Sequence, residues 1–217
     1  MDDELLDVVD ERGRPLGVKR RGDVHRDGDW HLAFHLWVIQ PGGVLFQRRA
    51  AGKSSWPGFL DASAAGHLLA GETVPDGLRE VEEELGAAYA FTDLVPLGVH
   101  RVVDTERSGV VNRELQHVFA VCDPRPLARW TGFDRVELDG LVLVDHDAFA
   151  VLAGARAGDA ADPATRVVAA RAWDGVRERD VEVSAAEVVP APYLAAIAVD
   201  LRRVARGERP GAGTPAA

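Results

Sequence analysis

Residues 66–86 read GHLLAGETVPDGLREVEEELG, and this is the most informative segment of the sequence. Thr73 has the side chain of an N-cap, Asp76 three residues later completes a capping-box-like pair, and Pro75 fits the first turn of a helix. Gly86 stands where a residue in the left-handed conformation commonly ends a helix. The stretch therefore predicts a short helix with well-defined ends.

The predicted helix is strongly acidic. Residues 72–84 hold six carboxylates against the single base Arg79, a net charge of −5 in 13 residues. At about 100° per residue, Glu80, Glu83 and Glu84 fall on one stripe of the helix. A solvated face usually pairs such acids with Lys, but this stretch contains no Lys and its like charges repel one another. The spacing therefore favours a bound cation, and carboxylates are ligands of hard ions such as Mg²⁺.

Composition limits what the whole chain can be. Its 217 residues carry 25 basic and 35 acidic side chains, for a net charge of −10, and 47% of them are hydrophobic. The apolar content supports a packed core, and the acidity argues against a nucleic acid polymer as partner, because phosphate neutralisation needs surplus Lys and Arg. No apolar run approaches the roughly 20 residues that span a bilayer, and the first residues are acidic rather than signal-like. With Cys122 as the single cysteine, we expect a cytoplasmic protein without a membrane partner.

Strand-like segments surround the acidic helix. Apolar patterning predicts strands before it at residues 32–39 and 44–47, and after it at residues 94–103 and 113–121. Strands interrupted by a helix and then resumed indicate an α+β fold with a mixed sheet.

The composition changes after about residue 150, where Ala, Val and Arg predominate. Residues 184–206 have the spacing of an amphipathic helix, and residues 207–217 are rich in Gly, Pro and Ala. We therefore expect a main domain over residues 1–150, a helical C-terminal extension packed on it over residues 151–206, and a disordered tail over residues 207–217.

The acidic stretch resembles the Nudix box of the Nudix hydrolase superfamily. In that pattern a Gly is followed after five residues by Glu, and after seven more by Arg-Glu-apolar-x-Glu-Glu-x-Gly-apolar. Gly66 and Glu72 have the expected spacing and residues 79–87 fit the run throughout, but six residues rather than seven separate Glu72 from Arg79. The resemblance implies the Nudix fold, an α/β/α sandwich with a mixed sheet.

The resemblance also implies a pyrophosphohydrolase that uses Mg²⁺, or alternatively Mn²⁺, to cleave a diphosphate linkage in a small molecule, such as a nucleoside di- or triphosphate or a prenyl diphosphate. The residues that match its metal ligands are Glu80, Glu83, Glu84 and the carbonyl group of Gly66. Glu80, Glu83 and Arg79 are also expected among the catalytic residues, and Glu83 matches a base that activates water. Arg79 matches a group that fixes the carboxylates. Glu72 either supports this network or is an anion stabilised by the start of the helix.

A second resemblance covers roughly residues 10–116. The segments HLAFHLW at 31–37, QRRAAGK at 47–53 and AGH at 65–67 look like type I isopentenyl diphosphate isomerase, an enzyme of the same fold. The residues that match its second metal or substrate site are His25, His31, His67 and Glu114. The residues that match its diphosphate contacts are Arg21, Arg49 and Lys53.

Two departures from the isomerase pattern favour hydrolysis over isomerisation. The isomerases carry a catalytic Cys immediately before the Gly-His pair, where this chain has Ala65, and alanine cannot transfer a proton. The chain also keeps the full Glu set of the Nudix box, which the isomerases lack. An isomerase-like enzyme remains the alternative, and a non-catalytic diphosphate-binding module is weaker still, because an unneeded cluster of like charges is destabilising.

Several neighbours of these motifs carry less specific signals. Arg48 and Arg49 point to opposite faces of a strand, and Arg49 is the one expected at the phosphate. His35 is expected to be a core or surface histidine, and Trp56 either anchors its loop or stacks on a ligand. We expect the 104–112 loop and the C-terminal helices to shape the pocket for the group attached to the diphosphate. By resemblance, a homodimer is common on this fold.

Overall fold

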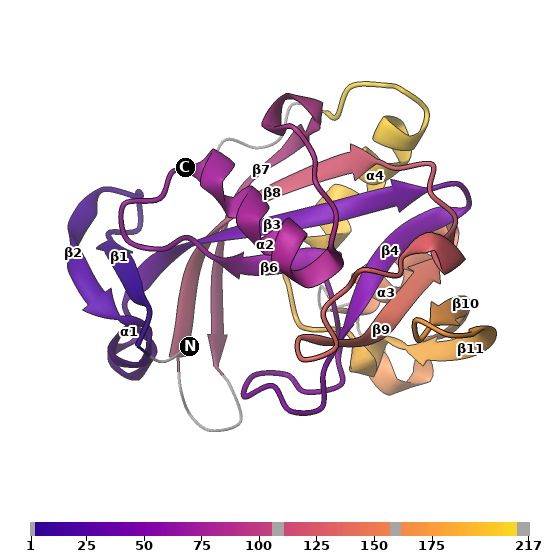
Figure 1. The fold of residues 1–217 in the computed structure, drawn as a ribbon, viewed down its shortest axis with the longest axis horizontal. Coiled ribbons are helices and arrows are strands. Elements are labelled where there is room, and N and C mark those ends of the chain that lie inside the picture. The colour runs from indigo at the N-terminus through magenta and orange to yellow at the C-terminus, as the bar shows by residue number, and fades with distance from the viewer. Residues whose placement is uncertain (1–2, 106–110, 157–161, 212–217) are drawn as a thin grey trace.

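The computed structural model of the chain describes residues 3–105, 111–156 and 162–211. Within these residues one hydrogen-bonded sheet carries helices on both of its faces (Figure 1). The strands are β1 (Leu5–Val9), β2 (Pro15–Arg20), β3 (Trp30–Gln40), β4 (Gly43–Arg49), β5 (Leu60–Asp61), β6 (Ala64–His67), β7 (Val95–Thr105), β8 (Val111–Cys122), β9 (Leu138–Val144), β10 (Val167–Trp173) and β11 (Glu178–Ser184). The helices are α1 (Arg21–Asp27), α2 (Leu78–Leu85), α3 (His146–Arg156) and α4 (Leu194–Ala205).

Strand β3 is the centre of the sheet. It pairs in parallel with β8 from Trp30 to Ile39, and on its other edge it pairs antiparallel with β1, β6 and β4 in turn. Nearly the whole strand is buried, which matches its run of apolar residues. The combination of parallel and antiparallel pairs confirms the predicted mixed sheet.

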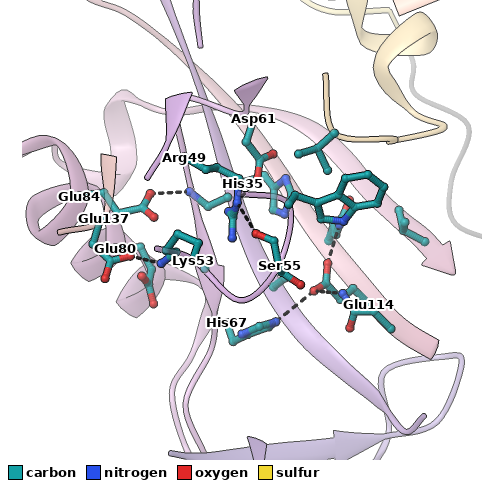
Figure 2. A pocket seen from close by; sticks show the side chains of 18 of the residues that line it. His35, Arg49, Lys53, Ser55, Asp61, His67, Glu80, Glu84, Glu114 and Glu137 are labelled. Carbon is teal, nitrogen blue, oxygen red and sulfur yellow. Dashed lines mark hydrogen bonds and ion pairs between the residues drawn. The ribbon is translucent and has the colours of Figure 1, made fainter. Parts of the chain in front are cut away.

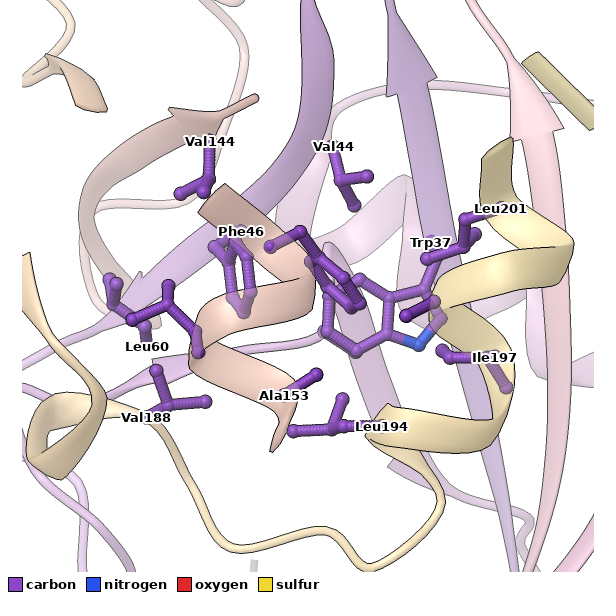
Figure 3. Close-up of a cluster of buried hydrophobic side chains, with 14 of the residues drawn as sticks. Trp37, Val44, Phe46, Leu60, Val144, Ala153, Val188, Leu194, Ile197 and Leu201 are labelled. Atoms are coloured by element: carbon purple, nitrogen blue, oxygen red, sulfur yellow. The ribbon is translucent and has the colours of Figure 1, made fainter. Parts of the chain in front are cut away.

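The two faces of β3 belong to two different cores because successive side chains of a strand alternate. Phe34 and Leu36 pack with Val81 and Leu85 of α2 on one face. On the other face Trp37 and Ile39 pack against α3 and α4, with the aromatic rings of Trp37, Phe46 and Phe149 in mutual contact (Figure 3). Each large apolar side chain buried in this way contributes roughly 1.5–3 kcal/mol to folding.

The ends of the acidic helix are as the sequence predicts. The Asp76 carboxylate accepts hydrogen bonds from the backbone N–H of Thr73 at 2.7 Å and from its hydroxyl group at 2.6 Å. A 3₁₀ turn at Val74–Gly77 then leads into α2. Gly86 ends the helix with φ +62°, in the left-handed region that favours glycine.

The C-terminal extension corrects the expectation of helices throughout residues 151–206. Strands β10 and β11 form a hairpin in this region and lengthen the sheet beyond β9. Helix α4 is confirmed, but it begins at Leu194 rather than near Ser184. The Ala- and Val-rich composition suggested helix, whereas pairing with β9 buries Ala170, Ala172 and Trp173 and so favours a strand.

Two other sequence expectations concern segments at the limits of the described residues. Strands β7 and β8 extend to Thr105 and from Val111, so residues 106–110 of the expected loop lie outside the description. Of the expected tail, Gly211 donates its backbone N–H to Asp200 at 2.7 Å, and residues 212–217 lie outside the described part. None of the helices within the described ranges has the length and apolar character needed to cross a membrane.

Candidate active site

A cavity of about 360 Å³ opens between α2, the short strand β6 and the first halves of β3 and β8. Carboxylates of α2 line one side of it, and histidines from α1, β3 and β6 line another. The cations Arg49 and Lys53 reach into it from the end of β4 and the loop that follows (Figure 2). The sequence-predicted site residues other than His31 and Glu72 therefore line one pocket, although they come from different elements of the fold.

Glu84 is the most deeply buried carboxylate of α2, with 4% of its surface exposed. It accepts hydrogen bonds from the backbone N–H of Ala65 at 3.0 Å and from the side-chain amide of Gln47 at 3.2 Å. Burial raises the pKa of Glu84 to about 8, because two neutral donors do not compensate for the lost hydration of a charge. Burial makes the charged form of this carboxylate unfavourable, and a bound cation would offset that free-energy cost.

Glu80 packs directly on the backbone of Gly66. A Cβ atom at position 66 would lie 2.1 Å from the carboxyl carbon of Glu80, so only glycine fits there while Glu80 keeps its position. Burial raises the pKa of Glu80, and the Arg79 guanidinium partly offsets that effect. The glycine that opens the motif thus makes room for a carboxylate of the helix.

Arg79 joins three carboxylates. Its guanidinium lies 3.2 Å from Glu72, 2.8 Å from Glu80 and 2.8 Å from Glu83. Burial opposes the charge on Arg79, but these ion pairs outweigh burial and raise its pKa further above the ordinary value. Glu72 also accepts the backbone N–H of Leu69 at 2.7 Å, so the one-residue-short spacing leaves Glu72 within the network.

Glu83 differs from the other two carboxylates of the stripe. Its side chain is 56% exposed, and Arg79 is the partner that the structure places on it within the described residues. It borders the same cavity as Glu80 and Glu84. Glu83 is therefore the carboxylate with the greatest freedom to move toward a ligand or a water molecule.

Three histidines and a glutamate form a second cluster beside the carboxylates. Candidate ligand atoms of His25, His31 and His67 lie within 4.8 Å of one another. Strand register explains the grouping, because His31 is opposite Glu114 on β8 and Ala33 is opposite His67 on β6. Glu114 lies 3.0 Å from Nε2 of His67 and 3.7 Å from Nε2 of His31.

The proton positions in this cluster suit a metal ion. Nδ1 of His31 lies 3.1 Å from the carbonyl oxygen of Asp29 and therefore carries the proton, which leaves a lone pair on Nε2. That buried Nε2 has no hydrogen-bond partner among the described residues, and it faces Oε1 of Glu114, which is also an acceptor. A cation between the two atoms would satisfy both, and imidazole with carboxylate is a ligand set that divalent transition metals accept.

Burial keeps His67 of the cluster neutral. It lowers the pKa of His67 to about 3 despite the contact with Glu114. Burial opposes the charge on Glu114, but contacts with the two histidines hold its pKa well below the ordinary value. Neutral imidazoles and an ionised carboxylate are the forms that bind metals.

The cations expected at a phosphate group already have carboxylate partners. Arg49 lies 3.1 Å from Asp61 and donates to the carbonyl oxygen of Ser55 at 3.0 Å. Lys53 forms an ion pair with Glu137. Arg21 lines the pocket 3.4 Å from Glu4.

Arg48 points away from the pocket, as strand alternation predicts. It donates to the carbonyl oxygen of Gly58 at 3.0 Å and pairs with Glu187 at 3.3 Å. Of the two neighbouring arginines, Arg49 is therefore the one that lines the cavity.

Among the described residues, sequence reasoning missed one histidine of the pocket and five carboxylates, which are Glu4, Asp61, Asp104, Asp134 and Glu137. Asp61 and Glu137 lie on segments without a recognisable motif, so no sequence signal could have found them. His35 was expected to be a core or surface histidine, but it lines the cavity and contacts Tyr193. Strand alternation was the available signal, because it places His35 on the same face of the strand as His31 and Ala33.

Trp56 is held by its own loop while it borders the cavity. Its indole N–H donates to Asp104 at 3.1 Å, and its ring meets Phe59 edge to face. With φ +48° it occupies the left-handed region, which is uncommon for a bulky residue. The structure therefore supports the loop-anchor role, and the ring still forms part of the pocket wall.

Comparison with known proteins identifies the family. The NUDIX domain family matches residues 29–164. An uncharacterised Nudix hydrolase of Clostridium acetobutylicum is 34% identical over 154 residues, which cover 69% of this chain and 74% of that protein. The isopentenyl-diphosphate Delta-isomerase of Clavibacter sepedonicus is 37% identical over 131 residues, covering 57% of this chain and 68% of the isomerase.

Solved structures agree with the sequence relatives. A protein of Deinococcus radiodurans known from its crystal structure superposes with a TM-score of 0.53 at 25% identity, over 73% of this chain and 92% of the other. The predicted fold and both resemblances are thereby confirmed. The chain belongs to the NUDIX domain family, in a group whose curated relatives include both Nudix hydrolases and isopentenyl-diphosphate isomerases.

Proposed function

We propose that the chain hydrolyses a diphosphate linkage in a small molecule with the help of divalent metal ions. The observation that carries this proposal is the buried carboxylate pair Glu80 and Glu84, raised in pKa and facing a pocket beside two cations. Such a pair is stabilised by a metal ion, and a metal-bound diphosphate brings the negative charge that Arg49 and Lys53 can bind.

The charge of the cavity supports a metal requirement. Among the described residues, nine carboxylates and four Arg or Lys side chains line it, a formal excess of five negative charges when every group is ionised. A diphosphate is itself an anion, and it would be repelled from this pocket at short range. Divalent cations remove the repulsion, so substrate and metal are expected to bind together.

Two donor sets fit different kinds of ion. The oxygen ligands Glu80, Glu83, Glu84 and the carbonyl group of Gly66 suit Mg²⁺, with Mn²⁺ as the alternative. The cluster of His25, His31, His67 and Glu114 suits a transition metal better, because imidazole is a softer ligand. A bound metal would neutralise phosphate charge and lower the pKa of a bound water molecule.

The protein's own side chains supply orientation and proton transfer. Arg79 holds the carboxylates of Glu80 and Glu83 in place through its ion pairs. Arg49 and Lys53, at the end of β4 and in the loop that follows it, bind the phosphate oxygens. Glu83, the exposed carboxylate of the stripe, accepts a proton from the attacking water.

The test is a diphosphate panel incubated with the purified full chain and MgCl₂. The chain should release phosphate or a monophosphate, and Glu83→Gln should lower kcat by at least about 100-fold, as expected for loss of a general base. Glu82→Gln is the matched control, because Glu82 lies on the same helix, is exposed and does not line the pocket. Unchanged turnover in Glu83→Gln would contradict the mechanism.

An isomerase-like activity is the second candidate, supported by the named isomerase relatives and by the histidine–Glu114 cluster. Ala65 lines the pocket opposite His35 and offers no group for proton transfer. Incubation with isopentenyl diphosphate separates the two reactions. Rearrangement to the dimethylallyl isomer without phosphate release would favour the isomerase, and phosphate release would favour hydrolysis.

We also propose that residues 1–150 form the Nudix domain and that residues 151–206 complete its pocket. A cytoplasmic location is proposed from the single cysteine and the acidic composition. We further propose a homodimer, which light scattering on the purified chain would distinguish from a monomer.

A further inference from the structure

His35 lies where the open pocket meets the packed core. It shares one face of β3 with Ala33, which lines the pocket, and with Trp37, which is buried beneath the C-terminal helices. His35 itself is 7% exposed and lines the cavity together with Arg49 and Asp61 (Figure 2). A buried polar ring in this position needs a hydrogen-bond partner on its core side, and its pocket side is open to a ligand or water.

Tyr193 provides the partner on the core side. Its hydroxyl oxygen lies 2.9 Å from Nδ1 of His35, and its side chain is buried. The ring of His100 on β7 stacks against Tyr193 with a centroid separation of 4.9 Å. Tyr193 lies directly before α4, beyond residues 29–164 that match the family.

The segment that carries Tyr193 is itself fixed at the pocket. Val188 forms a parallel bridge with Leu60, and the backbone N–H of Val189 donates to the carbonyl oxygen of Leu60 at 2.8 Å. Val189 and Ala191 line the cavity. The hydroxyl group of Tyr193 is therefore held in a defined place beside His35 rather than on a mobile arm.

The direction of this hydrogen bond follows from counting donors and acceptors. Among the described residues, Nδ1 of His35 is the acceptor that lies within reach of the Tyr193 hydroxyl. If His35 donated instead, the buried hydroxyl proton would have no acceptor, which is the costlier arrangement. Burial lowers the pKa of His35 and raises the pKa of Tyr193, so both groups are neutral. Tyr193 therefore donates, and the imidazole proton is on Nε2.

We propose that Tyr193 is a positioning residue that fixes His35 in its Nε2–H form, so that His35 presents a neutral hydrogen-bond donor to a phosphate oxygen in the pocket. No described side chain accepts from Nε2 of His35. Arg49 and Lys53 must each break an ion pair with a carboxylate before they bind a ligand, whereas this N–H group has no such partner among the described residues. The identity of the ligand as a diphosphate rests on the proposed function, whereas the position of the proton does not.

The first experiment observes the proton directly. In the ¹⁵N-labelled full chain, long-range ¹H–¹⁵N correlation spectra should show His35 with a protonated Nε2 and an unprotonated Nδ1. Tyr193→Phe keeps the ring and removes the hydroxyl group, and it should convert His35 to a mixture of tautomers. A protonated Nδ1 in the wild-type protein would overturn the proposal.

The chain offers a matched control in its only other tyrosine. Tyr89 donates to Asp123 at 2.7 Å, and neither residue lines the site pocket. Tyr89→Phe therefore removes a comparable hydrogen bond and should leave the His35 resonances unchanged. A change of the same size in both variants would show a general structural effect and would count against the specific role of Tyr193.

The second experiment measures the consequence for binding with magnesium and methylenediphosphonate, a diphosphate that cannot be hydrolysed. Tyr193→Phe should weaken its binding by about 3- to 10-fold, the range for one hydrogen bond, and should raise KM with little change in kcat. Unchanged affinity alongside altered tautomers would overturn the role of His35 in binding. If the wild-type protein binds no diphosphate while His35 keeps its Nε2 proton, the proposed function fails and the positioning by Tyr193 stands.

Discussion

Gly66→Ala is the substitution whose effect follows most directly from the structure. The added Cβ would lie 2.1 Å from the carboxyl carbon of Glu80 and 2.4 and 2.5 Å from its two oxygen atoms. Carbon atoms in contact are separated by about 3.5–4.0 Å, so the carboxyl group must retreat by roughly 1.4 Å or more. The carbonyl group of residue 66 remains in the variant, so the change tests Glu80 rather than the carbonyl ligand.

Such a displacement of Glu80 should change the stability of the fold little, but it should weaken metal binding strongly. Glu80 is a flexible side chain whose burial raises its pKa, so moving it should change the free energy of unfolding by less than about 1 kcal/mol. Metal ligands tolerate deviations of only about 0.2 Å, so Glu80 cannot retain its coordination. We expect kcat/KM to fall by about 10- to 100-fold, which corresponds to roughly 1.4–2.8 kcal/mol.

The assay compares Mg²⁺ binding by calorimetry, diphosphate turnover and urea unfolding in the same preparations. Gly17→Ala is the control, because a Cβ on that β2 residue meets no atom within 4 Å. Wild-type Mg²⁺ affinity and turnover in Gly66→Ala would refute the placement of Glu80 against Gly66. Loss of Mg²⁺ binding together with a large loss of stability would show instead that the backbone, and not Glu80, accommodates the clash.

Two further predictions concern the helix that carries the carboxylates. The pKa of Glu84 is raised to about 8 in the folded state, so the folded state binds this proton more tightly than the unfolded state. The metal-free protein should therefore lose stability as the pH rises from about 5 to about 8, by up to about 5 kcal/mol. Urea unfolding at several pH values measures this slope, and Glu84→Gln should flatten it; an equal slope in that variant would assign the effect to another group. Gly86→Ala should destabilise the fold by about 1–3 kcal/mol, because φ is +62° and the new Cβ would lie 2.4 Å from the carbonyl oxygen of Gly132. Thermal unfolding checks this, and an unchanged Tm would contradict the strain argument.

Local signals predicted the acidic helix and the residue types of the pocket well. Thr73, Asp76 and Gly86 set the helix ends through contacts within a few residues, and such contacts are visible in a sequence. The grouping of His31, His67 and Glu114 came from resemblance, and strand register now gives its physical cause.

Long-range contacts were harder to predict. Strands β10 and β11 depend on pairing with β9, which overrides the helical preference of an Ala-rich segment. The contact between His35 and Tyr193 joins residues 158 positions apart, and no periodicity in either segment indicates it. The pairing of Arg49 with Asp61 likewise depends on how β4 and β5 lie together.

Asp61 and Glu137 compete with any anionic ligand for the cations Arg49 and Lys53, because they form ion pairs with them in the pocket. Any ligand that reaches these cations must displace a carboxylate that is already in place, and a weakly charged ligand gains too little to do so. A metal-bound diphosphate can displace both at once, because its two phosphate groups are covalently joined and the second contact forms at high effective concentration. The same two pairs that keep the substrate-free site neutral at this end would thus discriminate against monophosphates, including the product of the reaction.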